Sequence, residues 1–238
     1  MSSDACLALL LDGPMQSWGH TSRFERRTTL LHPTRSAILG VIAAALGIDK
    51  HGPTEAEHLA RFSALRITVV TLPRRSRRDG DLLIQRLEDY HTVTGIRRAS
   101  GKVDDDATVQ TYRHYLLDAR FGALLEGSSD RLHEIAAALR NPKWGIWLGR
   151  KCCLPASPVL VAVKPDQAQA WSELLRRVGY AGTESIEQFD RVVEVAPSDA
   201  NADMIEDTPV AFGNPIGERH GPRWISRVPK SPGEKPKS

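Results

Sequence analysis

The stretch from residue 7 to residue 48 constrains the fold of this 238-residue chain more than any other part. It begins with an apolar run at 7–11, which Asp12-Gly13-Pro14 ends. A short apolar run stopped by turn residues is typical of a strand that is buried on both faces. Between residues 38 and 46, apolar side chains recur at the spacing of a helix with one buried face. The stretch therefore predicts a strand, a loop and a helix that pack together.

The residues at both ends of this helix support its assignment and suggest a ligand. Pro33 suits the first turn, Thr34 or Ser36 can cap the first amides, and Gly47 suits the position just past the end. The preceding connector is basic, with Arg23, Arg26 and Arg27. A helix N-terminus beside a basic, glycine-rich loop is a place where phosphate binds. Glycine and proline in such a connection can equally do no more than turn the chain, so both interpretations stay open on this stretch alone.

The pattern farther along predicts an α+β fold of the ferredoxin-like kind. Further strands are predicted at 66–72, 82–87, 116–125, 144–148 and 159–163, with helices at 55–62 and 128–141. The order strand, helix, strand, insertion, strand, helix, strand suits two helices packed on one antiparallel sheet. Residues 1–163 are therefore expected to form one ferredoxin-like (RRM-like) βαββαβ domain.

A polar insertion and a less regular C-terminal region complete the predicted organisation. At about 74–115 an arginine run around an Asp-Gly turn leads into basic and aromatic residues, which predicts a protruding thumb, a long hairpin outside the core. Residues 164–228 are expected to form a smaller region with a helix at 168–178 and a strand at 191–195. The tail at 229–238 contains no large apolar residue and is predicted to be disordered.

Composition excludes several classes of protein. The hydrophobic fraction of 41% and charged fraction of 26% are ordinary for a globular protein. No apolar run is long enough to span a membrane and no signal-peptide pattern opens the chain, so a cytoplasmic protein without a membrane partner is expected. Cys6, Cys152 and Cys153 are too few and wrongly spaced for a disulfide framework or a zinc site. We expect neither a metal nor a cofactor.

The strongest chemical signal is the interleaving of basic and aromatic residues in loops. Examples are Tyr90 with His91, Tyr112 with Arg113, and Trp147 with Arg150. Arginine neutralises phosphates and aromatic rings stack on unpaired bases, which is how single-stranded RNA is generally held. Any one such residue is more often a core anchor or a solvated charge, but the set as a whole favours RNA.

An enzymatic interpretation has less support. The chain has no G-x-S-x-G, H-E-x-x-H, P-loop or dinucleotide fingerprint. His91, beside Tyr90 and near Lys102, could act as a general base in metal-independent RNA cleavage, although a lone histidine next to a tyrosine is unspecific. The acidic run at 104–106 could attract Mg²⁺, but an exposed acidic loop tip is the simpler interpretation.

Five blocks of sequence, in this order, carry a specific resemblance. They are GPMQSWG at 13–19, PTRSAILG at 33–40, DYHTVTG at 89–95, QTYRHYLLDA at 110–119 and WLGRKC at 147–152. Together they resemble the CasD subunit family of the type I-E CRISPR Cascade complex, in the RAMP superfamily. Trp147 stands where relatives use tyrosine, which keeps a ring but loses the phenol. After residue 163 the resemblance is loose and rests on Arg219, Arg223 and Trp224.

The resemblance implies a ferredoxin-like domain with a thumb and a non-catalytic RNA-binding function. Members of the family grip the 5′ handle of the CRISPR RNA, cap one end of the backbone filament and help to seat the large subunit for antiviral DNA targeting. The expected partners are therefore CRISPR RNA, the other Cascade subunits and, through the assembled complex, target DNA. The alternative is a metal-independent endoribonuclease that processes CRISPR repeat RNA, because CasD-like proteins of another subtype cut such RNA.

Sixteen residues are expected to bind the RNA, in groups that follow the sequence blocks. Near the first helix they are Gln16, Trp18, Arg23, Arg26, Arg27, Arg35 and Ser36. In the thumb they are Tyr90, His91, Arg97, Arg98, Tyr112 and Arg113, and in a second wall Trp147, Leu148 and Arg150. Arginine supplies bidentate phosphate contacts, Gln16 can read a base edge, and the aromatic rings stack.

Overall fold

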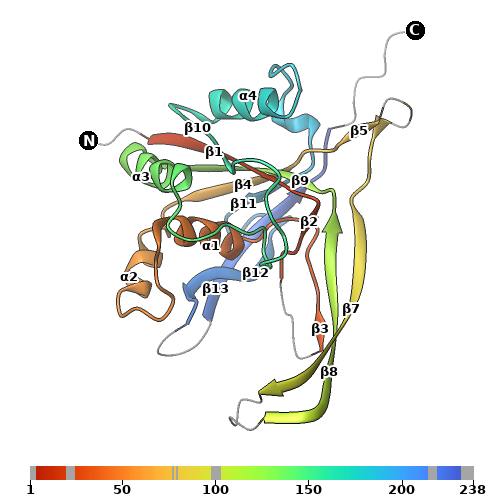
Figure 1. Ribbon diagram of the computed structural model, residues 1–238. Coiled ribbons are helices and arrows are strands. Elements are labelled where there is room, and N and C mark those ends of the chain that lie inside the picture. Colours follow the sequence, from red (N-terminus) through yellow and green to blue (C-terminus); the bar gives the residue numbers. More distant parts are fainter. Residues whose placement is uncertain are drawn as a thin grey trace.

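The apolar run at residues 7–11 lies in a seven-stranded antiparallel sheet (Figure 1). The computed structural model describes residues 4–19, 25–76, 78, 80–97, 103–213 and 219–231, with the backbone alone described at 96, 97 and 103–107. The strand order is β10 (Leu160–Lys164), β1 (Asp4–Asp12), β9 (Arg120–Ser128), β4 (Arg66–Thr71), β11 (Arg191–Glu194), β13 (Arg219–Val228) and β12 (Asp203–Ala211). Every neighbouring pair is antiparallel. The predicted combination of an antiparallel sheet with a few helices is confirmed.

Strand β1 is buried on both faces, as its uninterrupted apolar sequence predicts. Its side chains alternate between two hydrophobic clusters, with Leu7, Leu9 and Leu11 on one face and Cys6, Ala8 and Leu10 on the other. The first face is covered by α1 (Arg35–Leu46) and α3 (Ser129–Arg140), and the second by α4 (Gln167–Arg177). The sheet is therefore sandwiched between helices at this end.

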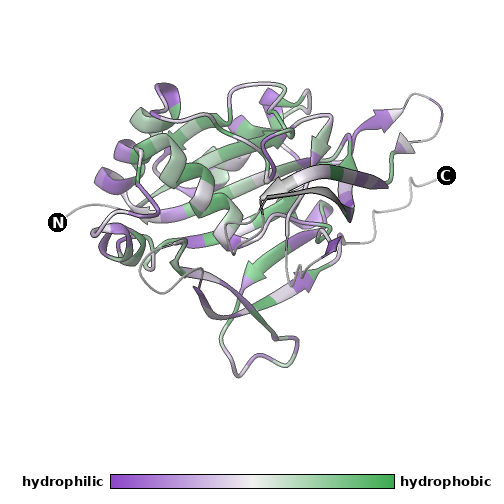
Figure 2. Cartoon of the chain, turned by 60° about the horizontal axis from the view of Figure 1, so that its bottom comes forward, coloured by the Kyte–Doolittle hydropathy of each residue, from purple (hydrophilic) through white to green (hydrophobic). Residues whose placement is uncertain are grey.

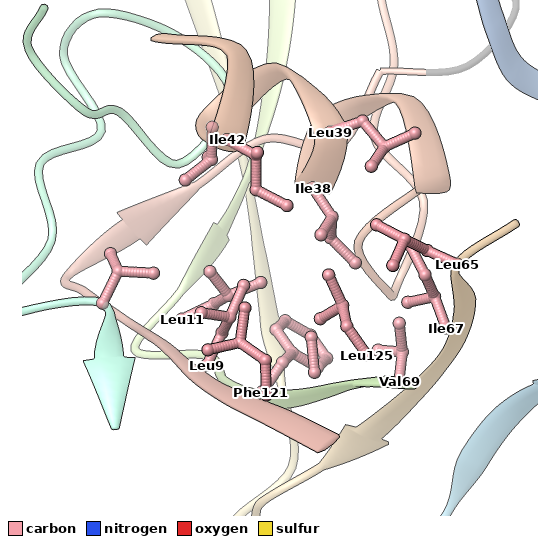
Figure 3. Close-up of a cluster of buried hydrophobic side chains, with 14 of the residues drawn as sticks. Leu9, Leu11, Ile38, Leu39, Ile42, Leu65, Ile67, Val69, Phe121 and Leu125 are labelled. Atoms are coloured by element: carbon pink, nitrogen blue, oxygen red, sulfur yellow. The ribbon is translucent and has the colours of Figure 1, made fainter. Parts of the chain in front are cut away.

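The main core lies between α1 and the sheet (Figure 3). Ile38 and Ile42 of α1 point toward Leu9 and Phe121 in strands β1 and β9, and all four are at most 1% exposed. Burying one such side chain contributes about 1.5–3 kcal/mol relative to leaving it in water. Figure 2 shows the same segregation over the molecule, with hydrophobic residues concentrated in the strands beneath the helices. This burial fixes α1, and with it any site built on its exposed side.

Both ends of α1 are capped by residues that the sequence predicts as caps. The Thr34 side chain accepts a hydrogen bond from the Ala37 amide, and Thr34 is therefore the N-cap. Gly47 follows the helix at a φ of 72°, and its amide is directed at the last carbonyl groups. Helix α3 likewise begins after Ser128, whose side chain caps the Arg131 amide. The predicted caps are confirmed, whereas the prediction for Pro33 is wrong, because Pro33 precedes the N-cap and does not lie in the first turn.

The predicted thumb is a long hairpin of β7 (Gln85–Arg97) and β8 (Val103–Leu117), which projects from the body (Figure 1). Its strands are paired from Gln85 opposite Leu117 to Arg97 opposite Val103. On the other edge of β8 lie β2 (Met15–Gln16) and β3 (Arg26–Arg27), which tie the hairpin to the loop after β1. The chain enters the hairpin through the short strands β5 (Arg75–Ser76) and β6 (Gly80–Asp81).

Three strand predictions are corrected by the structure. Residues 144–148 form no strand: Leu148 is the one residue of the run that is fully buried, Ile146 packs against the core while partly exposed, and the Leu148 amide donates to the Cys153 carbonyl in a turn. The apolar run 116–125 is divided between β8 and β9 by a turn at Asp118, where φ is 49°. In the run 82–87, only the part from Gln85 onward is strand.

The C-terminal part contains more strand than its sequence predicts. Strands β12 and β13 were not predicted, because their pairing contains irregularities and both carry a proline, so their hydrophobic alternation is broken. They extend the main sheet through β11, whose predicted position is confirmed. The remaining elements are α2 (Glu55–Ala60) and the 3₁₀ turn η1 (Ile186–Gln188). Among the described residues, no helix has the length and apolar character needed to cross a membrane.

Candidate nucleic-acid interface

A groove of about 500 Å³ runs beside the exposed side of α1. We call it the α1 groove; its lining includes Arg27, Ser36, Gly40, Trp147, Arg150, Phe212 and His220. Four of these residues, Arg27, Ser36, Trp147 and Arg150, are among the predicted RNA-binding residues, although they come from separate parts of the chain. Phe212 and His220 were missed, because they belong to the C-terminal region, where the sequence pattern gave no signal.

Arg150 is held in a fixed position at this groove. Its guanidinium donates to the carbonyl of His114 at 3.2 Å and to the carbonyl of Arg27 at 2.8 Å, and it lies over the Tyr115 ring at 4.6 Å. These two hydrogen bonds use two of the five N–H donors of a guanidinium. Burial raises the pKa of Tyr115, so its phenol stays neutral under the cation. Arg150 can therefore bind an anion without having to be ordered first.

A tight turn at residues 148–153 positions Arg150 and Trp147. The Ser17 amide donates to the Leu148 carbonyl at 3.1 Å, and the Leu148 amide donates to the Cys153 carbonyl at 2.7 Å. Gly149 has a φ of 98°, and a Cβ atom there would lie 1.8 Å from the Ser17 carbonyl oxygen. Only glycine permits this close approach. The turn therefore couples the WLGRKC block to the GPMQSWG block.

We expect Gly149→Ala to displace the turn and to weaken the α1 groove. The added methyl group overlaps backbone, which cannot move aside as a flexible side chain can, and the positive φ adds strain of about 1–3 kcal/mol. The free energy of unfolding from urea titration should fall by at least that amount. Gly80→Ala is the matched control for the strain of a positive φ, since Gly80 also has a positive φ and no atom of the described residues lies within 4 Å of its would-be Cβ. Equal losses in the two variants would contradict the steric argument.

A second cluster lies on one face of the β7–β8 hairpin. Tyr90 and Tyr112 are opposite one another in the strand register, with ring centroids 5.4 Å apart. The Arg26 guanidinium lies 5.1 Å from the centre of the Tyr112 ring. Tyr90 is 53% exposed, so its ring surface is open to a ligand. We call Arg26, Tyr90 and Tyr112 the aromatic face of the hairpin; it offers a stacking surface beside a positive charge.

The opposite face of the hairpin carries different chemistry. Side chains alternate along a strand, so His91 points away from the face of Tyr90. His91 is opposite Thr111, and Arg113 follows on the same face, beside Arg27 of β3 in the strand register. The Arg113 Nε donates to the Thr111 hydroxyl at 3.1 Å. The strand geometry therefore separates Tyr90 from His91, which the ribonuclease interpretation placed in one site.

Three predicted contact residues are core residues instead. Gln16, Trp18 and Leu148 have no exposed surface. The Gln16 amide nitrogen donates to the carbonyls of Leu11 and Ala119, at 3.0 and 2.6 Å, and its oxygen accepts from the Trp18 indole at 3.1 Å. The structure corrects the prediction that these side chains touch RNA, because their hydrogen-bonding groups are already used and covered. They hold the loop after β1 against the base of the hairpin.

Arg35 is also a structural residue. It is 3% exposed, and its guanidinium donates to the carbonyls of Phe62, Ser63 and Leu65 and to the Glu194 carboxylate, at 2.6 Å. Its own amide, in the first turn of α1, donates to Asp207 at 2.7 Å. A carboxylate of the chain itself therefore occupies the helix N-terminus where phosphate was predicted to bind. The prediction that Arg35 touches RNA is therefore corrected as well, because its side chain is buried and its Nη1 and Nη2 groups already have partners within the chain.

The other predicted residues fall outside the described part of the structure. Arg23 and Arg98 are not among the described residues, and only the backbone is described at Arg97. Lys102 also lies outside them, and the acidic run 104–106 is described by its backbone alone. Their predicted contacts stay predictions.

Comparison with known proteins agrees with this geometry. A family model described as CRISPR-associated protein (Cas_Cas5) matches residues 6–211. The Cascade subunit CasD of Escherichia coli K12 is 32% identical over 158 residues, which cover 65% of this chain and 69% of that protein. A chain of a solved CRISPR RNA-guided surveillance complex has a TM-score of 0.69 at 28% identity, over 96% of this chain and 95% of its own. A crystal structure of a Cas protein has a TM-score of 0.58 at 28% identity, over 94% and 95%.

These similarities extend well beyond single motifs. The family model spans most of the chain, from β1 to the end of β12. The identity to the E. coli subunit covers more than two thirds of that subunit. Together they confirm the resemblance to CasD subunits and show that this chain belongs to the Cas5 family of CRISPR-associated proteins.

Proposed function

We propose that this protein is a non-catalytic RNA-binding subunit of a Cascade-type CRISPR surveillance complex and that it grips the 5′ handle of the CRISPR RNA. The observation that carries the proposal is that the aromatic face of the hairpin and the α1 groove both adjoin the short strand β3, which contributes Arg26 to one and Arg27 to the other. A single strand of RNA crossing β3 would meet both. The E. coli relative is a Cascade subunit, which supports the assignment to such a complex.

The two surfaces divide the binding chemistry between them. Arg27 and Arg150 line the α1 groove and Arg113 lies next to Arg27, so that positive charge gathers where phosphates would pass. Tyr90 and Tyr112 offer ring faces on which unpaired bases stack regardless of their identity. Backbone charge and base stacking together are the usual means of holding single-stranded RNA.

The topology supports the finer fold assignment that we also propose, a ferredoxin-like unit. Taken in chain order, β1, β4, β9 and β10 are its four strands, and they lie in the order β10, β1, β9, β4 in the sheet. Helices α1 and α3 follow the first and third of them and cover the same face. This is a split βαβ arrangement, into which the β7–β8 hairpin is inserted as a thumb. The region after residue 163 would then be an extension of this unit.

We propose three protein-level roles that accompany RNA binding. The subunit would cap the backbone filament of the complex, help to seat the large subunit, and reach target DNA only through the assembled particle. The projecting hairpin supports these roles, because an element with little contact to its own core is suited to reach a neighbour.

The salt dependence of RNA binding tests the groove directly. We expect Arg27→Ala to weaken binding of a handle-sequence RNA and to reduce the slope of log K against log salt by about 0.7, the value for one lost phosphate contact on a single strand. Arg61→Ala is the control, because Arg61 is an exposed arginine at the C-terminal end of α2 that pairs with Glu57 and does not line the α1 groove. An unchanged slope for Arg27→Ala would exclude Arg27 from backbone contact.

A cleavage assay separates this function from the endoribonuclease alternative. We expect purified protein, incubated with its repeat RNA in the presence of a chelator, to leave the RNA intact. The reason is that His91 and Tyr90 point to opposite faces of β7 and cannot act together on one phosphate. Site-specific cleavage that His91→Ala abolishes would contradict the non-catalytic proposal.

A further inference from the structure

Cys152 and Cys153 lie in the turn that presents Arg150 to the α1 groove. Cys152 is exposed, Cys153 is fully buried, and their Sγ atoms are 4.0 Å apart. Arg150 and Lys151 directly precede Cys152 in the chain. A small oxidant can reach the Cys152 sulfur, and the Cys153 sulfur is close enough to react with Cys152 once Cys152 is oxidised.

We propose that Cys152 and Cys153 form a reversible disulfide when a peroxide oxidises Cys152, and that this bond weakens anion binding by Arg150 in the α1 groove. The disulfide itself is independent of the proposed function. Its effect on RNA binding rests on that function.

The oxidation takes place in two steps. The Cys152 thiolate attacks a peroxide oxygen, an S–O bond forms as the O–O bond breaks, and hydroxide leaves and takes up a proton as water. The Cys153 sulfur then attacks the sulfenic sulfur of Cys152, an S–S bond forms as the S–O bond breaks, and the hydroxyl leaves as water with the Cys153 proton. In total two thiols lose two electrons and two protons, and one hydrogen peroxide becomes two water molecules.

The environment of each thiol sets the order of these steps. Burial raises the pKa of Cys153 to about 12, so this sulfur is a thiol and reacts slowly with a solute. Cys152 is therefore the sulfur oxidised first, and the 4.0 Å separation lets Cys153 intercept the sulfenic acid before further oxidation.

The turn couples the disulfide to Arg150. The Cys153 amide donates to the Arg150 carbonyl at 2.8 Å. The Cys152 sulfur lies 3.6 Å from the hydroxyl of Tyr115, and the Arg150 guanidinium lies over the ring of the same tyrosine. Neighbouring Cα atoms are about 3.8 Å apart, closer than in most disulfides, so the backbone of the turn must change when the bond forms. The new geometry removes the Cys152 sulfur from Tyr115 and shifts Arg150 out of the groove. A bond strained in this way is readily reduced, which makes the change reversible.

Thiol counting on the full-length protein tests the disulfide. The protein is treated with hydrogen peroxide, quenched and denatured, and its free thiols are then titrated. We expect the count to fall from three to one, with Cys6 still free because it is buried, and to return to three after dithiothreitol. Mass spectrometry should find the peptide that contains both cysteines lighter by two hydrogens. A sulfinic acid on Cys152, or a Cys152 bond to another molecule with Cys153 still free, would overturn the proposal.

RNA binding tests the coupling. A fluorescent single-stranded RNA of repeat sequence is the probe, and we expect oxidation to weaken its binding about tenfold, the loss of one charged contact. Cys152 is exposed, and serine keeps a donor for the Tyr115 hydroxyl. Cys152→Ser should therefore keep its affinity under peroxide, as should Cys153→Ala. A disulfide that leaves the affinity unchanged would overturn the coupling. If the reduced protein fails to bind the RNA, the proposed function fails, whereas the thiol count still decides whether the disulfide forms.

Discussion

Replacing Asp207 by alanine is expected to lower the free energy of unfolding by about 3–5 kcal/mol, because it leaves the two buried guanidinium groups of Arg35 and Arg223 with a single carboxylate, that of Glu194. The carboxylate is 2% exposed. It accepts from Arg223 through Nε at 2.8 Å and Nη2 at 2.6 Å, and from the Arg35 amide at 2.7 Å. The substitution therefore removes both a bidentate ion pair and the acceptor at the first turn of α1.

An exposed aspartate on the same strand is the matched control. Asp203 also lies on β12 and also pairs with an arginine, Arg227, but both side chains are more than half exposed. Asp203→Ala should therefore cost less than about 1 kcal/mol. Urea unfolding of both variants measures the two changes in the free energy of unfolding. Similar losses would mean that the buried network is not what holds β12 and β13 to α1.

This network explains Arg35, which the sequence alone assigns to RNA, and Arg223, on which the resemblance after residue 163 partly rests. Arg35, from the PTRSAILG block, and Arg223, from the final Arg-Trp segment, share the Glu194 carboxylate at 2.6 and 3.1 Å. They are 3% and 9% exposed. Two arginines and two carboxylates balance in charge, which is what burial requires. Motif residues that resemble ligand contacts here join the C-terminal strands to the first helix.

The second large effect is expected on RNA affinity. Tyr90→Ala removes the most exposed ring of the aromatic face and should weaken binding of a handle-sequence RNA by about 1–3 kcal/mol, which is about five- to 150-fold. Stacking on an exposed ring is lost, whereas the strand backbone is unchanged. Fluorescence anisotropy at fixed salt measures the effect.

Two variants make this result specific. Tyr90→Phe keeps the ring and should retain most of the affinity. Val109→Ala removes an exposed side chain on the opposite face of the hairpin, to which the alternation from Tyr112 assigns it, and should leave binding unchanged. A loss in Tyr90→Phe equal to that in Tyr90→Ala would point to the phenol rather than to stacking. Losses in all three variants would indicate a general effect on the hairpin.

The sequence predicted elements whose signals are local. The apolar run at 7–11 predicts a strand buried on both faces, and in the structure seven consecutive residues of β1 are buried. Thr34 and Gly47 mark the ends of α1 because capping depends on neighbouring residues alone. The polar, aromatic composition around Tyr90 and Tyr112 likewise predicted a projecting hairpin.

What the sequence could not predict depends on contacts between distant residues. Gln16 and Arg35 have the chemistry of RNA ligands, and only the fold reveals that their partners are carbonyls and carboxylates of the chain itself. Asp207 is 172 positions from Arg35, with no local signal that the two meet. Phe212 was missed for the same reason, since it joins the α1 groove through strands whose pattern is broken.

The most direct test of RNA gripping is ultraviolet crosslinking in the assembled complex. The tagged protein is co-expressed with its neighbouring CRISPR subunits and repeat array, and the crosslinked residues and nucleotides are mapped by mass spectrometry and sequencing. We predict crosslinks from Tyr90, Tyr112 or Trp147 to the 5′ end of the mature guide RNA. Absence of the protein from the complex, or crosslinks to uncut repeat RNA alone, would contradict the account.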